Sequence, residues 1–106
     1  MSYDVTLTTR TVDGVETVVF DRNHTSNTAR MWREAGCDLA EFVGATAVEL
    51  RDALAPAIAQ MKADPGRFLA MEPANKWGSY ESCREFLEDI YVACATHPSA
   101  TVEVDW

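Results

Sequence analysis

Residues 3–20 read YDVTLTTRTVDGVETVVF, and this stretch decides the fold of the chain. Its two halves alternate polar and apolar residues with a period of two, which is typical of half-buried strands. Asp13-Gly14 lies between them and predicts a hairpin, since a two-residue type I′ turn needs positive φ at both central residues. With that turn Leu7 faces Phe20 and Thr9 faces Val18. The buried face is then expected to hold Val5, Leu7, Val18 and Phe20, and the wet face Thr6, Thr8, Arg10, Thr17, Val19 and Asp21.

Two longer segments predict helices, and the end of the chain predicts another strand. Thr46 and Glu49 have the spacing of a capping box and open a helix that reaches Met61, with Pro56 expected to kink or break it near Ala55. Ser79 is a candidate cap for the last helix. That helix carries an apolar stripe composed of Tyr80, Cys83, Phe86, Leu87, Ile90, Tyr91 and Cys94. Residues 101–106 alternate again and predict a closing strand.

The middle of the chain begins with a polar stretch, residues 22–28, that predicts a loop. A short helix is expected over Ala29–Ala35, ended by Gly36, and one or two further turns over residues 37–43. These elements predict an α+β fold in one domain, residues 1–106. A small antiparallel sheet, made of the N-terminal hairpin and the C-terminal strand, is expected to carry about three helices on one face.

Composition narrows the classes of partner. The chain has 17 acidic and 9 basic residues, a net charge of −8, which argues against direct binding of nucleic acid or of an anionic membrane surface. No secretory signal or membrane-spanning stretch is recognisable, so a cytoplasmic location is expected. Cys37, Cys83 and Cys94 match no disulfide framework and are expected as free thiols.

The three cysteines do not indicate a catalytic or metal site. Cys83 and Cys94 lie three helical turns apart, about 16 Å, too far to share one ion, so no metal or other cofactor is expected. Cys37 follows the Gly36 helix stop and is the cysteine expected to be exposed. No nucleophile signature or acid–base pair surrounds it, so no catalytic residue is assigned, and the chain reads as a non-enzymatic protein rather than an enzyme.

An acidic stripe on the last helix is the first candidate site. Four carboxylates fall on one narrow helix face, and like charges at i, i+4 weaken a helix rather than support it. The stripe is either a solvated face or a docking surface for a basic partner. It consists of Glu81, Glu85, Glu88 and Asp89.

Two polar loops that precede helices are the second candidate site. Backbone N–H groups at helix starts can bind anions, although Asn, Ser and Thr there are commonly caps. If the two helix starts converge, the loops could form one site for a small anionic or amide-bearing ligand. Its residues would be Asn23, Asn27, Asn75, Trp77 and Ser79.

The same loops carry a resemblance. The Tyr3-Asp4 opening, the Asn23-His24-Thr25-Ser26-Asn27 loop and Asn75-x-Trp77-Gly78 before the last helix resemble small proteins of tailed phages and of actinobacterial prophage genomes. Such proteins often carry Tyr-Asn where this chain has Arg22-Asn23. The resemblance spans most of the chain and implies a phage-linked, intracellular setting, but no activity.

Three functions remain open at this point. The preferred one is an acidic interaction protein that docks on a basic surface, for example that of a nucleic-acid-binding host protein. The alternatives are a binder of a small ligand between the two loops and a small enzyme with an unrecognised site.

Overall fold

A three-stranded antiparallel sheet in the order β2-β1-β3 forms one layer of the computed structural model, which describes residues 1–106. β1 spans Ser2–Arg10, β2 spans Glu16–Thr25 and β3 spans Thr101–Asp105. Both other strands pair with β1, which is therefore the central strand. The predicted hairpin, the closing strand and the α+β class are confirmed.

The hairpin turn differs from the expectation. Thr11 N–H donates to the Val15 carbonyl and Gly14 N–H to the Thr11 carbonyl, and only Gly14 (φ 80°) has positive φ in this turn. The connection is therefore a three-residue loop with glycine in the left-handed position rather than a type I′ turn.

A β-bulge at Val19 then shifts the register between β1 and β2 by one residue. Leu7 pairs with Phe20 as predicted, but Thr8 pairs with Val18, and Thr9 pairs with Thr17. A one-residue slip moves side chains to the other face of a sheet. Val18, expected in the core, is accordingly 59% exposed, while the bulged Val19 packs against the core.

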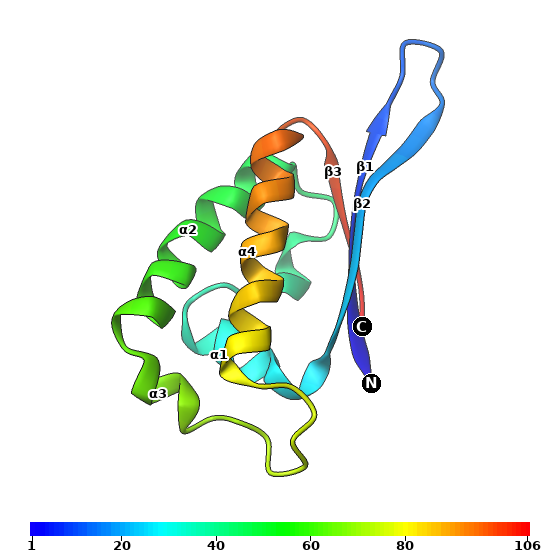
Figure 1. Cartoon of the computed structure of the whole chain (residues 1–106). Helices are drawn as coiled ribbons and strands as arrows, with labels where there is room; N and C mark the ends of the chain where they lie inside the picture. The colour runs from blue at the N-terminus through cyan, green and yellow to red at the C-terminus, as the bar shows by residue number, and fades with distance from the viewer.

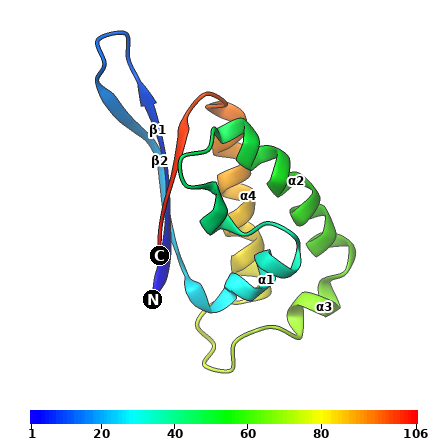
Figure 2. The same cartoon turned by 180° about the vertical axis from the view of Figure 1, so that it is seen from behind.

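The helices all lie on one face of the sheet (Figures 1 and 2). α1 is Ala29–Glu34, α2 is Ala47–Ala63, α3 is Pro65–Leu69 and α4 is Tyr80–Thr96. Two 3₁₀ helices, η1 (Ser26–Thr28) and η2 (Leu39–Phe42), flank α1. The buried apolar side chains form one contiguous cluster, as expected of a single compact domain. None of the helices has the length and apolar character needed to cross a bilayer.

The helix starts follow the predicted caps. Thr46 and Glu49 form the capping box of α2, and the Ser79 hydroxyl accepts from Ser82 N–H at the start of α4. Pro56 does not break α2, which continues to Ala63. Pro56 itself is exposed, and the buried Leu54 and Ala57 on either side of it hold the helix in place despite the missing hydrogen bond.

One edge of the sheet is covered by a neighbouring segment and the other is not. Residues 44–47 lie along β3: Gly44 N–H donates to the Val102 carbonyl, and Val102 N–H donates to the Ala45 carbonyl, both at 2.8 Å. β2 pairs with β1 alone and has no such cover. The turn end of the β1–β2 hairpin extends beyond the helical layer, as both views show. The molecule therefore presents an uncovered sheet face, one uncovered edge and a projecting hairpin.

Candidate functional site

The sheet face that no helix covers is strongly acidic. On the central strand Asp4 lies directly opposite Asp105, while Thr6 lies opposite Glu103 on one side and Asp21 on the other. The Thr6 hydroxyl donates to the Asp21 carboxylate at 3.4 Å, which confirms that the two side chains share this face. We call Asp4, Asp21, Glu103 and Asp105 the open acidic face.

Few cations balance these carboxylates. Arg10 lies farther along the same strand, on the projecting hairpin, and its guanidinium is 3.9 Å from Glu16. None of the four carboxylates of the open acidic face forms an ion pair. Sequence reasoning placed Asp21 on the wet face but missed the cluster, because the cluster depends on which strand pairs with β1.

The acidic stripe of α4 is partly neutralised within the protein. The Glu88 carboxylate lies 3.2 Å from the Lys62 ammonium and 3.3 Å from the Arg84 guanidinium. Asp89 pairs with Arg22 of β2. Glu81 and Glu85 are exposed and form no ion pair. Half of the predicted docking stripe is therefore paired with cations of the protein, whereas the open acidic face has no such ion pair.

The two polar loops do meet, at Gly78. A Cβ added to Gly78 would lie 2.7 Å from the Cγ2 atoms of both Thr25 and Thr28, and Gly78 has φ +94°. The chain before α4 thus crosses directly over the end of β2 and the 3₁₀ turn η1. The convergence of the two segments, which the sequence suggested, occurs through a close backbone approach rather than across a shared hollow.

Most of the polar side chains proposed for a joint site have partners inside the protein. Asn23 is not in a loop but in β2, because that strand runs on to Thr25, and its amide donates to Asp4 at 2.8 Å. The Asn75 side-chain oxygen accepts from Trp77 N–H at 3.0 Å. Ser79 is occupied as the cap of α4. Trp77 is 68% exposed, and Asn27 lies beside a separate hollow.

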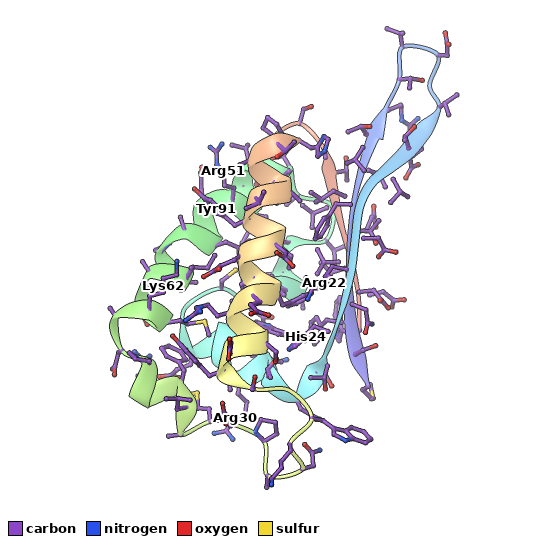
Figure 3. All side chains as sticks on the ribbon, viewed as in Figure 1. Arg22, His24, Arg30, Arg51, Lys62 and Tyr91 are labelled. Atoms are coloured by element: carbon purple, nitrogen blue, oxygen red, sulfur yellow. The ribbon has the colours of Figure 1, made fainter.

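Arg22 and His24 lie between β2 and α4 (Figure 3). His24 stacks on Phe86 with ring centroids 4.9 Å apart, and Arg22 pairs with Asp89 of the same helix. Burial, together with the nearby Arg22 charge, lowers the pKa of His24 below its ordinary value. These residues attach the sheet to the last helix, and no carboxylate pairs with His24 as a catalytic partner would.

All three cysteines are free and buried. Cys37 is only 1% exposed, so the expectation that it would be exposed is wrong: the chain after Gly36 turns inward, and Cys37 N–H donates to the Trp32 carbonyl. No group of three or more histidine, cysteine or acidic side chains has a geometry that could hold a metal ion.

The buried thiols are expected to be unreactive in the native protein. Burial raises the pKa of Cys37 and Cys83 to about 12 and that of Cys94 to about 11, and the thiolate is the reactive form. Ellman's reagent at pH 8 should therefore label all three cysteines at once in urea and none of them rapidly in the folded protein. Rapid labelling of one thiol in the native state would show that its burial is incomplete.

Comparison with known proteins adds no relative. No family model, curated protein or solved structure matches this chain. The resemblance to phage and actinobacterial proteins therefore stays an expectation drawn from the sequence.

Proposed function

We propose that this chain is a non-enzymatic interaction protein that binds a basic partner over the open acidic face. One observation carries the proposal: four carboxylates gather, without a cation among them, on the sheet face that the helices leave uncovered. A partner surface with lysine and arginine side chains could place a positive charge opposite each of the four carboxylates.

The arrangement of these carboxylates is not one that favours stability. Like charges directly opposite one another on neighbouring strands are destabilising, and Asp4 faces Asp105 in this way. A basic partner would relieve that repulsion, and the net charge of −8 would speed its approach. Binding would thus offset a cost that the free protein carries.

The partner class follows from the same chemistry. A protein surface that binds nucleic acid presents lysine and arginine at positions where phosphates lie, and four clustered carboxylates can occupy such positions. We propose a cytoplasmic host protein with such a surface as the partner, in line with the phage-linked setting that the resemblance implies. Occupying the surface would keep nucleic acid away from it.

The proposal is tested with decalysine as a basic probe and two variants of equal charge. The sheet variant carries Asp4→Asn, Asp21→Asn, Glu103→Gln and Asp105→Asn. The control variant carries Glu81→Gln, Glu85→Gln, Glu88→Gln and Asp89→Asn in the acidic stripe. Each variant loses four negative charges, so a difference between them reports where the probe binds and not the net charge.

The sheet variant should bind decalysine at least roughly tenfold more weakly than the control variant at low salt. Each exposed ion pair contributes about 1 kcal/mol at 4 Å in water, and about 1.4 kcal/mol corresponds to a tenfold change. Raising the salt concentration should weaken wild-type binding, because added ions screen exposed charges. Equal losses in the two variants, or a larger loss in the stripe variant, would rule out the open acidic face as the docking surface.

A further inference from the structure

A hollow of about 410 Å³ lies where the start of β1 meets η1 and α1. Its volume falls within the range of about 300–1,000 Å³ that is usual for small-molecule sites. The residues that matter for its chemistry come from four parts of the chain. They are Tyr3, Asn27, Arg30, Arg33 and Trp106, and we call the hollow the Arg30 pocket.

The Arg30 pocket is lined by two arginines, although the protein as a whole is acidic. Arg33 is already engaged: it donates to the Tyr3 hydroxyl at 3.0 Å, and its Nε lies 3.9 Å from the Asp38 carboxylate. Arg30 is exposed and has no ion pair and no side-chain hydrogen bond. One guanidinium is therefore available, which suits a ligand with a single negative charge. Its planar fork matches a carboxylate, which it can bind through two parallel hydrogen bonds.

One wall of the pocket is an aromatic surface that packs on buried rings. Trp106 stacks on Tyr3 with ring centroids 6.0 Å apart and planes inclined by 12°. Tyr3 is itself buried and packs edge-on against Trp32, with centroids 5.0 Å apart. Trp106 remains 56% exposed. An exposed indole held in this way offers a flat apolar face to a ligand without the entropy cost of ordering a mobile ring.

Asn27 adds a polar group to the same pocket. Its backbone N–H donates to the Thr25 hydroxyl at 3.2 Å, but its side-chain amide forms no hydrogen bond within the protein. An amide supplies both a donor and an acceptor. The pocket thus combines one unpaired guanidinium, one flat apolar wall and one free amide, the usual make-up of a site for a small polar ligand.

We infer that the Arg30 pocket binds a small, flat aromatic monoanion, with its carboxylate on Arg30 and its ring on Trp106. The Asn27 amide contacts a polar edge of the ligand. This site goes beyond the proposed docking function and does not depend on it. Of the joint site predicted from the sequence, the Arg30 pocket retains only Asn27. Arg30 and Trp106 take the place of the predicted residues 75–79.

The first test compares four small probes by titration calorimetry. 2-Naphthoate supplies ring and charge, 2-naphthamide supplies the ring alone, and acetate and inorganic phosphate supply charge without a ring. Saturable binding is expected for 2-naphthoate, with 2-naphthamide at least roughly tenfold weaker because the charged hydrogen bond to Arg30 is missing. Acetate and phosphate should show no saturation. Phosphate binding as tight as that of 2-naphthoate, or no naphthoate binding, would overturn the inference.

Matched variants locate the probe. Arg30→Gln and Trp106→Leu should each weaken 2-naphthoate binding at least roughly tenfold. The controls are Arg51→Gln and Trp77→Leu, which make the same changes elsewhere and should bind as the wild type does; Figure 3 labels Arg30 and Arg51 at opposite ends of the helical layer. Equal losses in Arg30→Gln and Arg51→Gln, or a loss in Trp77→Leu alone, would contradict the site. The sheet variant described above should bind 2-naphthoate no more weakly than the wild type, so the two proposals can fail separately.

Discussion

Replacing Trp32 with alanine is expected to reduce the free energy of unfolding by about 3–5 kcal/mol, the usual range for a buried tryptophan. Trp32 is fully buried, and its ring contacts elements on both sides of the core: Tyr3 of β1 at 5.0 Å and Phe86 of α4 at 5.8 Å between centroids. Domains of this size have total stabilities of about 5–15 kcal/mol. The expected loss is therefore at least about a fifth of the total stability, which should clearly lower the urea midpoint.

A second variant separates the packing of Trp32 from its polar group. The indole Nε1–H is buried without a hydrogen-bond partner, and leaving a buried donor unpaired costs about 1–3 kcal/mol. Trp32→Phe removes that donor and leaves a smaller cavity, so it should lose less than half as much stability as Trp32→Ala. Urea denaturation followed by circular dichroism measures both. A loss below about 1 kcal/mol in Trp32→Ala would mean that this ring does not join the sheet to the helices.

The second large effect is expected for Gly78→Ala, with a loss of about 2–5 kcal/mol in the free energy of unfolding. A left-handed residue other than glycine costs roughly 1–2 kcal/mol, and overpacking typically adds about 1–3 kcal/mol. Both terms apply here, because Gly78 has φ +94° and its new methyl group would lie 2.7 Å from Thr25 and Thr28.

Gly44→Ala is the matched control for this change. Gly44 has φ +82° but nothing within 4 Å of an added Cβ, so it carries the backbone cost without the clash. Combining Gly78→Ala with Thr25→Ser and Thr28→Ser removes both clashing methyl groups and should recover part of the lost stability. If Gly78→Ala and Gly44→Ala have the same midpoint of urea unfolding, residues 75–79 do not pack on the end of β2 as described.

The elements that sequence reasoning predicted well are those with local signals. The α2 capping box depends on Thr46 and Glu49, and the α4 cap depends on Ser79, so each helix start is encoded within a few residues. β1 and β3 likewise follow from the alternation of their own residues. Such signals need no knowledge of the rest of the chain.

The errors all concern features that depend on distant residues. Asp13-Gly14 is compatible with both a two-residue and a three-residue turn, and only the pairing of β1 with β2 shows that Val19 bulges and Val18 turns outward. Cys37 follows a helix stop, but the fold of the following chain buries it. The open acidic face could not be predicted without the strand order, which places β3 beside β1 and Asp105 opposite Asp4.

The most direct test of the proposed docking function is a map of where a basic partner contacts the protein. Backbone ¹H–¹⁵N spectra of the wild-type protein are recorded during a titration with decalysine at low salt and again at high salt. Binding over the open acidic face predicts shift changes gathered in residues 4–8, 21–23 and 101–105, and their loss at high salt. Changes confined to residues 81–89 of α4, with the sheet unaffected, would contradict it.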